Sequence, residues 1–261
     1  MESFDGFTPF QMNQILYFPF DKDCPIKINS NIKKNLLDSI PIFKILLSLL
    51  TRIDVNGIKL TTIGNLPPQT VKEIYYLNYY PDMIIEKGIT KLTNEKDWII
   101  LHTAKIVLIQ AGILRKIRRK LLFTNKGRKY FEDERFNDLF HLFLRAFTIK
   151  FNWAYNDGYE NEQIGQLGFL YSLYLINKYG DTYKNLKYYS DLYFKAFPVF
   201  KSLRKTSEYD YDFTENALYT RFLGRFCKWF GFVQIQNSHN ELYINQNTRV
   251  KKTLLLSNLF K

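Results

Sequence analysis

Residues 112–131 read Gly-Ile-Leu-Arg-Lys-Ile-Arg-Arg-Lys-Leu-Leu-Phe-Thr-Asn-Lys-Gly-Arg-Lys-Tyr-Phe, and the fold that we predict for the chain follows from this stretch. Gly112 is a typical residue at the end of a helix, because glycine adopts the left-handed conformation without strain. Apolar residues then flank the basic tip Arg118-Arg119-Lys120, as in a two-stranded β-ribbon. Thr124 has a side chain suited to cap a following helix. The stretch therefore predicts the end of one helix, a ribbon with a basic tip, and the start of another helix.

The residues before this stretch predict the rest of one unit. Apolar periodicity and helix-start residues indicate four helices, and a turn leads into a short strand. These elements are helices at 32–39, 42–53, 68–78 and 95–111 and a strand at 58–61. From residue 40 to residue 133 the predicted order is helix, short strand, helix, helix, strand, basic tip and strand.

The segment 122–128, Leu-Phe-Thr-Asn-Lys-Gly-Arg, resembles the Leu-Thr-x-x-Gly-Arg ending of many bacterial winged-helix (winged helix-turn-helix) regulators. The resemblance covers residues 93–133, and the order of elements over 40–133 is also that of a winged helix. In those regulators the ribbon is the wing, and its basic tip lies against phosphates. Winged helices also mediate protein–protein contacts, so the resemblance implies a fold more firmly than a function. As a whole, the chain resembles an uncharacterised bacterial protein family, which implies no activity.

A weaker copy of the same pattern lies at 213–255. A helix predicted from Phe213 ends at Gly231, and the strands predicted to follow it are 232–235 and 241–244. An Asn-Ser-His-Asn turn separates these strands. We therefore expect a second winged-helix-like unit near the C-terminus.

The predicted domain organisation follows from these two units. The fold class that we expect is mainly α with short β-hairpins, in which two winged-helix-like units are joined by a central helical unit. The expected parts are an N-terminal arm and helix (1–39), a winged-helix-like domain (40–133), a central helical region (134–206) and a second winged-helix-like unit (207–261). Within the arm, Thr8 and Pro9 are suited to begin a helix.

The charge of the chain favours a polyanionic partner. The sequence has 37 Lys and Arg against 25 Asp and Glu, which gives a formal net charge of +12. Such a balance suits nucleic acid or an anionic surface, although it also serves solubility. No apolar run has the length of a membrane-spanning helix, so we expect no membrane partner. Duplex DNA is the favoured nucleic acid, and RNA stays open.

The ribbon holds the densest positive charge of the chain, with no acidic residue inside it. Phosphates would relieve the mutual repulsion of these cations. Alternatively, Lys and Arg on an edge strand protect it from aggregation. The nucleic-acid-binding residues predicted in this region are Arg115, Lys116, Arg118, Arg119, Lys120, Lys126 and Arg128.

The helices before the two ribbons differ in character. The helix at 95–111 is apolar on nearly every side, which is typical of a buried helix. In the second copy, Arg221, Arg225 and Lys228 lie at i, i+4 and i+7 and form a cationic stripe. This stripe could approach base edges or phosphates. It could equally pair with nearby acids, namely Asp191, Glu208, Asp210 or Asp212.

No pattern of catalytic or metal-binding residues stands out. His102, His141 and His239 lack partners at ligand spacing, and Cys24 and Cys227 match no metal spacing. We therefore expect no enzymatic activity, no metal and no cofactor. The scarce cysteines and an N-terminus without a signal-peptide pattern indicate a cytoplasmic protein.

Two functions remain open from the residues. The first is nucleic-acid binding, to duplex DNA through the basic wing, in a regulatory role. The second is a non-catalytic protein-interaction module or scaffold built on the winged-helix units. The charge of the ribbon favours the first function, and the buried character predicted for the helix at 95–111 favours the second.

Overall fold

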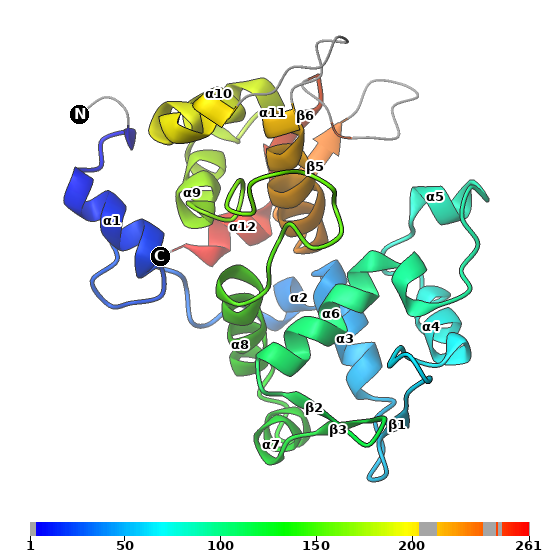
Figure 1. The fold of residues 1–261 in the computed structure, drawn as a ribbon. Helices are drawn as coiled ribbons and strands as arrows, with labels where there is room; N and C mark the ends of the chain where they lie inside the picture. The colour runs from blue at the N-terminus through cyan, green and yellow to red at the C-terminus, as the bar shows by residue number, and fades with distance from the viewer. Residues whose placement is uncertain (1–3, 204–212, 237–243, 245–246, 261) are drawn as a thin grey trace. The chain divides into compact units, whose positions relative to one another are not determined.

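The computed structural model describes residues 4–203, 213–236, 244 and 247–260 (Figure 1). The chain forms two compact units. Residues Ser30–Phe151 make up one of them, which we call the inserted unit. The other is the split unit, because Met1–Asn29 and Asn152–Lys261 together form it. Each unit has its own helices and its own three-stranded sheet.

The inserted unit packs its helices around a central one and closes with a small antiparallel sheet. In chain order its elements are α2 (Lys34–Leu37), α3 (Pro41–Leu50), β1 (Ile58–Lys59), α4 (Pro68–Tyr75), α5 (Met83–Glu86), the 3-10 turn η2 (Glu95–Asp97), α6 (Ile99–Gln110), β2 (Leu114–Ile117), β3 (Lys120–Phe123), α7 (Asn125–Glu132) and α8 (Phe136–Ile149). Helix α6 contacts α3, α8 and β2, so it lies at the centre of the core. The strand order is β1-β3-β2, and β2 and β3 run side by side below α6 in Figure 1.

Short-range signals set the ends of these elements. Pro41 begins α3, where its fixed φ suits the first turn and its missing N–H costs nothing. Gly112 has a φ of 72°, which lets α6 end and the chain turn into β2. The Thr124 hydroxyl accepts the N–H of Gly127 at 2.9 Å and so caps α7.

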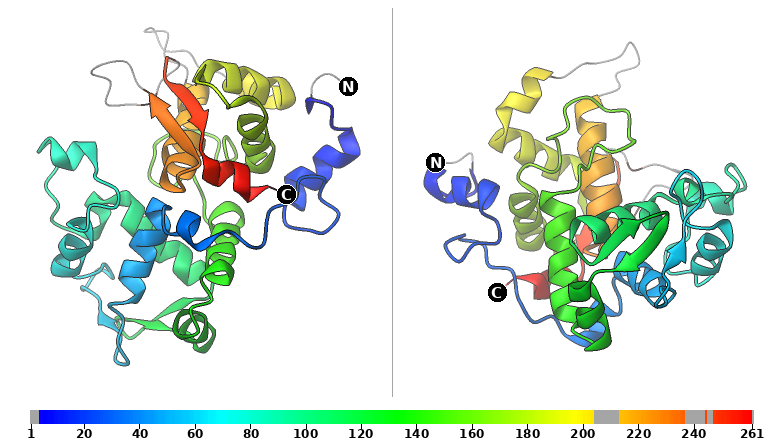
Figure 2. Two further views of the ribbon diagram at one scale, coloured as in Figure 1. Left: turned by 180° about the vertical axis from the view of Figure 1, so that it is seen from behind. Right: turned by 60° about the horizontal axis from the view of Figure 1, so that its bottom comes forward.

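The split unit combines the N-terminal arm with the second half of the chain. Its elements are α1 (Pro9–Tyr17), α9 (Phe169–Tyr179), β4 (Lys184–Asn185), α10 (Leu186–Ala196), the 3-10 helix η3 (Pro198–Leu203), α11 (Phe213–Leu218), the π-helix η4 (Tyr219–Cys227), β5 (Val233–Gln236), β6 (Arg249–Lys252) and α12 (Leu254–Leu259). Helix α1 packs on α9. The left view of Figure 2 shows β5 and β6 as paired arrows, the second of which leads into α12.

The two units repeat one order of elements: helix, strand, helix, helix, strand, strand, helix. The inserted unit follows it as α3, β1, α4, α6, β2, β3 and α7, and the split unit as α9, β4, α10, α11 with η4, β5, β6 and α12. In both sheets the third strand lies between the first and the second. The registers agree residue by residue, so that Lys59, Arg115, Ile117, Lys120 and Leu122 correspond to Asn185, Gln234, Gln236, Arg249 and Lys251.

The hydrogen bonds that join helix, ribbon and helix repeat as well. Gly112 and Gly231 follow the last helix before each ribbon and have φ values of 72° and 68°. The Thr124 hydroxyl donates to the carbonyl of Gly112 at 2.7 Å. The Thr253 hydroxyl donates to the carbonyl of Gly231 at 2.8 Å. The resemblance between the two halves is therefore one of backbone architecture.

The structure confirms the predicted fold class at the level of secondary structure, since the described chain is mainly helical with short antiparallel strands. The partner predicted for the second strand pair, at 241–244, is wrong. Strand β5 pairs with β6 at Arg249–Lys252. This register buries Val250 and places Thr253 where it caps α12. Residues 237–243 lie outside the described residues.

Candidate nucleic-acid interface

The tip of the β2–β3 hairpin is a two-residue turn of two arginines. Ile117 pairs with Lys120, so Arg118 and Arg119 alone connect the strands. Both have positive φ, 46° and 61°, as in a type I′ turn. Residues with a Cβ are strained in this conformation, and Asn-Gly is the sequence that usually forms it. The turn therefore presents two exposed arginines at a conformational cost.

The solvent face of the same sheet adds three cations. Arg115 of β2 and Lys120 of β3 share this face, because side chains alternate along a strand. Lys59 of β1 lies directly opposite Lys120. All three are exposed, and like charges placed opposite each other destabilise a sheet. The sequence predicts the strand at 58–61 that contains Lys59, but not the pairing with β3 that places Lys59 beside Lys120.

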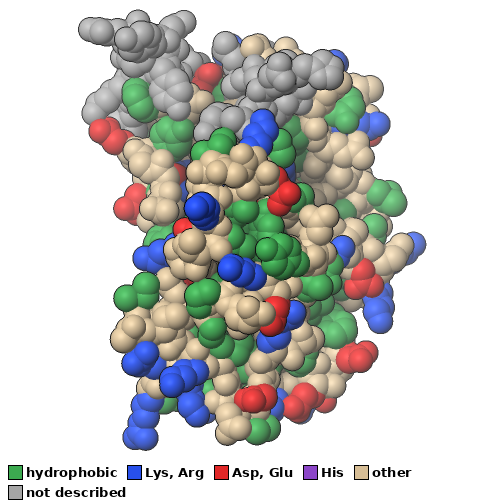
Figure 3. All heavy atoms as spheres, turned by 90° about the vertical axis from the view of Figure 1, so that its right-hand side faces the viewer, with side chains coloured by type: hydrophobic (Ala, Val, Ile, Leu, Met, Phe, Trp, Pro, Cys, Tyr) green, Lys and Arg blue, Asp and Glu red, His purple; other side chains and the backbone are tan. Residues whose placement is uncertain are grey.

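We call Lys59, Arg115, Arg118, Arg119 and Lys120 the cationic ribbon. None of the five forms an ion pair with any residue in the part of the chain that the structure describes. Two apolar side chains share the solvent face with them, Ile117 at 42% exposure and the half-buried Leu122. On the face of the molecule shown in Figure 3, Lys and Arg side chains gather at the lower left, apart from the Asp and Glu side chains.

The other cations predicted around the ribbon have different surroundings. Lys116 lies on the opposite face of the sheet, and its ammonium stands over Gly64, where a Cβ would overlap with it. Arg128 pairs with Glu132 at 3.3 Å. Lys126 is exposed, with its ammonium 5.6 Å from the centre of the Tyr130 ring. Of these three, Lys116 and Lys126 are exposed and have no carboxylate partner among the described residues, but Lys116 lies on the face opposite the cationic ribbon's solvent face.

Helix α6 has no exposed residue, as its apolar sequence predicts. Two of its polar side chains, His102 and Lys105, are buried and contact Glu95, whose exposure is 0%. Lys105 donates to the Glu95 carboxylate at 2.6 Å and to the carbonyl of Gly64 at 3.1 Å. His102 donates its Nδ1 proton to the same carboxylate, since an ionised carboxylate can only accept. These groups form a buried polar cluster behind the ribbon.

Within the cluster, the negative charge of Glu95 is compensated by the positive charge of Lys105. Burial opposes ionisation of Glu95, but hydrogen bonds from His102 and the charge of Lys105 more than offset it and lower the pKa of the carboxyl. Burial lowers the pKa of Lys105, although the attraction of Glu95 works in the opposite direction. The ion pair is thus directed inward and offers no charge to a ligand at the surface.

The structure places Arg221 inside the split unit, so the prediction that it approaches nucleic acid disagrees with its surroundings. Its side chain is 0% exposed and pairs with Asp157, at 2.6 and 3.1 Å. It also donates to the carbonyls of Asn161 at 2.6 Å and Tyr159 at 2.9 Å. Arg221 does form an ion pair, but its partner is Asp157, which is not among the acids that the sequence suggested, and Asp191 is not a partner. Residues 208–212, with the other three acids, lie outside the described residues.

The rest of the predicted stripe divides between interior and surface. Arg225 donates to the carbonyls of Trp153, Tyr155 and Asn156, at 2.9, 2.7 and 3.3 Å. Burial lowers the pKa of its guanidinium. Lys228 is exposed. The structure therefore brings Arg221 and Arg225 together around the segment 153–161 rather than on an open surface.

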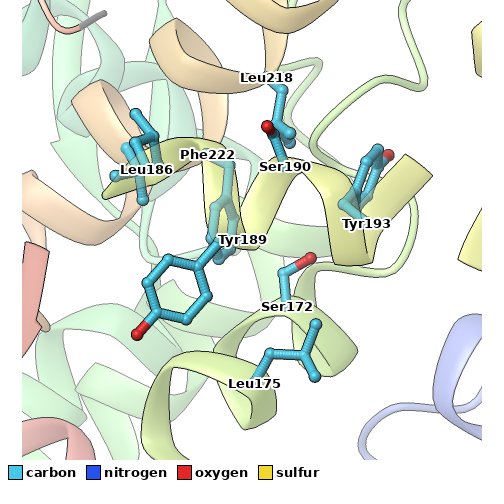
Figure 4. Close-up of a pocket in the computed structure, with 9 residues that line it drawn as sticks. Ser172, Leu175, Leu186, Tyr189, Ser190, Tyr193, Leu218 and Phe222 are labelled. Carbon is cyan, nitrogen blue, oxygen red and sulfur yellow. The ribbon is translucent and has the colours of Figure 1, made fainter. Parts of the chain in front are cut away.

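One small pocket lies between α9, α10 and the helix formed by α11 and η4 (Figure 4). Its lining is largely apolar and it has room for about one water molecule. The hydroxyls of Ser172 and Tyr189 are buried there without a hydrogen-bond partner among the described residues. In Figure 4 the Tyr189 hydroxyl points away from Ser172, so the two groups do not converge on one point.

The described ranges lack two other kinds of feature. No group of three or more His, Cys, Asp and Glu side chains is arranged to hold a metal ion there. No helix in those ranges combines the length and the apolar character needed to cross a membrane.

Residues 38–136 match the family model described as "Y4jL N-terminal domain". The match falls within the inserted unit and includes its sheet and α6. No curated protein and no solved structure matches the chain. The inserted unit is therefore similar to a domain whose description names no activity.

Proposed function

We propose that the protein binds nucleic acid, with duplex DNA as the favoured form, through the cationic ribbon. The observation that carries this proposal is the turn formed by Arg118 and Arg119. Both residues occupy the left-handed backbone region at the exposed end of a hairpin. The same turn would form more readily with Asn-Gly. Strained residues cluster at functional sites, so two arginines in this turn point to a function for their side chains.

The charges around the turn support the same proposal. Lys59 and Lys120 face each other across the sheet, and Arg115 shares their face. These cations repel one another, and the described residues offer them no carboxylate partner. Phosphates neutralise such a surface and release their condensed counterions, which is a large favourable term at low salt.

The element order supports the finer proposal that the inserted unit is a winged helix. Strands β2 and β3 with their tip would form the wing, and α3, α4 and α6 would be the three helices. The split unit would be a second unit of the same kind, because its strand order and register agree with those of the first. A cytoplasmic location fits the free thiols of Cys24 and Cys227.

The test is duplex DNA binding over a salt series with the full chain. The Arg118→Ala/Arg119→Ala/Lys120→Ala variant should reduce the slope of log K against log salt by about 2–3, since three phosphate contacts are lost. The matched control is Lys33→Ala/Lys34→Ala/Lys87→Ala, which removes three exposed lysines of the inserted unit outside the ribbon. The proposal fails if the wild type shows no affinity at low salt, or if the control lowers the slope as much as the ribbon variant.

A second variant separates the function of the turn from its stability. Arg118→Asn/Arg119→Gly should stabilise the inserted unit by roughly 1–2 kcal/mol, because it relieves the left-handed strain. The same change should weaken DNA binding. Arg118→Lys/Arg119→Lys keeps the charge and the strain, and should keep most of the affinity. If the Asn-Gly variant and the wild type bind DNA with equal affinity, the side chains of the turn do not contact DNA.

Two observations favour a second candidate function, a protein-interaction module. Helix α6 has no exposed residue to place in a groove of DNA. In addition, apolar side chains on and near α4 and α5 face solvent, namely Tyr76 at 77%, Ile89 at 63% and Met83 at 50% exposure. Absence of any binding to duplex DNA or RNA would favour this function over the first.

A further inference from the structure

The sheet of the split unit exposes a different set of side chains at the positions that match the cationic ribbon. Gln234 and Gln236 of β5 share a face with Arg249 and Lys251 of β6. We call these four residues the amide ribbon. Asn185 of β4 lies opposite Arg249 on the same face. Where the first sheet has cations and two apolar residues, the second has amides and two cations.

We propose that the amide ribbon reads base edges in the major groove of duplex DNA. This inference rests on the proposed function, because it assigns to that function a second and sequence-selective contact. The major groove admits a two-stranded β-ribbon. Gln forms a bidentate pair with adenine, and Arg or Lys contacts guanine, so all four residues are of the types that identify bases.

The amides are free to take a ligand. The side chains of Gln234 and Gln236 are exposed and form no hydrogen bond with any residue that the structure describes. They lie two residues apart on one face, a distance of about 6.8 Å at the rise of an antiparallel strand. That distance is close to two base-pair steps of about 3.4 Å each. A strand aligned with the groove would thus place the two amides at the level of two bases.

Arg249 is held in a defined position, which suits recognition of a base. Its guanidinium donates to the carbonyl of Tyr183 at 3.2 Å and lies 6.0 Å from the centre of the Tyr183 ring. In contrast, the side chains of Arg118 and Arg119 in the cationic ribbon have no such contact with any described residue. A guanidinium positioned in this way is better prepared for a bidentate contact with a guanine edge than the side chains of Arg118 and Arg119.

Helix α6 and the helix formed by α11 and η4 offer few exposed side chains for reading bases. No residue of α6 is exposed. In the split unit, Arg221 is enclosed and Arg225 is held by backbone carbonyls, whereas Lys228 is exposed. These helices offer few groups that could read bases, whereas the amide ribbon offers exposed amides and a guanidinium of suitable chemistry.

The test begins with selection of duplexes from a random pool by the full chain. The expected result is an enriched sequence containing adenine, preferred over random duplex by at least about tenfold. Gln234→Ala/Gln236→Ala should abolish that preference and leave the salt slope unchanged, because amides displace no counterions. The control Asn13→Ala/Gln163→Ala removes two exposed amides elsewhere in the split unit and should keep the preference.

Two results would overturn the inference while leaving the proposed function intact. One is salt-dependent DNA binding from which no sequence is enriched. The other is a preference that survives in Gln234→Ala/Gln236→Ala. An RNA duplex of the selected sequence should show no preference, since its major groove is too narrow for the ribbon. Absence of any duplex binding by the wild type would instead overturn both the inference and the proposed function.

Discussion

The sheet of the inserted unit and the sheet of the split unit have the same strand order and register, yet their exposed side chains differ. Five equivalent positions carry Lys, Arg, Ile, Lys and Leu in the first and Asn, Gln, Gln, Arg and Lys in the second. Backbone hydrogen bonds and buried side chains hold the register, so the solvent face can change without loss of the fold. The comparison shows that this architecture fixes positions and leaves their chemistry free.

The interiors of the two units differ in a related way. His102 and Arg221 each lie ten residues before the glycine that ends the helix. His102 contacts Glu95, which is nearby in the sequence. Arg221 pairs with Asp157, far away in the sequence. In the inserted unit, the buried polar residue at this position therefore contacts a neighbour in the sequence. In the split unit, the buried arginine instead binds a loop that is distant in the sequence.

The largest effect should come from Arg221→Met, which tests whether distant contacts hold the split unit together. The change leaves the Asp157 carboxylate buried without its cation and should destabilise the split unit by about 3–5 kcal/mol. Hydrogen exchange of the full chain measures the effect. We expect weaker protection of amides in the split unit and unchanged protection in the inserted unit.

The matched control for this experiment is Lys228→Met, at an exposed position that follows directly on η4. Loss of a cation at the surface should cost about 1 kcal/mol or less. If Arg221→Met loses no more stability than Lys228→Met, the contacts of Arg221 do not hold the split unit together, and the contrast between the two interiors disappears.

The second effect concerns the polar cluster of the inserted unit. Glu95→Gln removes the charge that compensates buried Lys105 and should cost about 3 kcal/mol at neutral pH. The pKa of Glu95 is lowered in the folded protein, so its contribution is complete above the ordinary value of 4.5 and is lost as the pH falls through the lowered folded value. Unfolding measured against pH should therefore show a smaller acid-dependent loss in Glu95→Gln than in the wild type. Parallel pH profiles would contradict this role of Glu95.

The smallest effect concerns an equivalent position that needs a glycine in the inserted unit and holds a large buried side chain in the split unit. Three residues after the capping threonine, the inserted unit has Gly127 and the split unit has buried Leu256. A Cβ at Gly127 would overlap with the backbone of Ile113, so Gly127→Ala should destabilise the inserted unit by about 1–3 kcal/mol. Thermal unfolding measures this change. Asn125→Ala, at an exposed position of the same helix, should change stability by about 0.5 kcal/mol or less. Equal stability of both variants would show that the backbone around Gly127 and Ile113 shifts enough to accommodate the added methyl group.

Sequence signals predicted the local parts of the fold well. The Thr8 cap with Pro9 behind it, the end of α6 at Gly112 and the cap at Thr124 all occur where the residues indicate them. The exposed cations at 115 and 118–120 were also predicted, because they surround a turn that the sequence itself marks. Whether these cations bind phosphate stays a prediction.

Other parts of the candidate site could not be predicted from residue patterns. Lys59 joins the cationic ribbon through pairing of β1 with β3, which lie far apart in the sequence. The register of the second ribbon depends on β6, which follows a connection whose length the pattern did not reveal. The pairing of β5 with β6 depends on burial of Val250 and on the capping position of Thr253 rather than on strand propensity.

The ends of the helices and the place of the basic turn follow from local sequence, because each of these features depends on backbone groups within one turn of the residue concerned. Which cations face solvent depends instead on tertiary contacts. Arg221 and Arg118 have the same charge, but Asp157 and several carbonyls enclose the first, whereas the second stands at the end of a hairpin. A guanidinium is buried only where distant groups replace its water, and no local pattern shows whether they do.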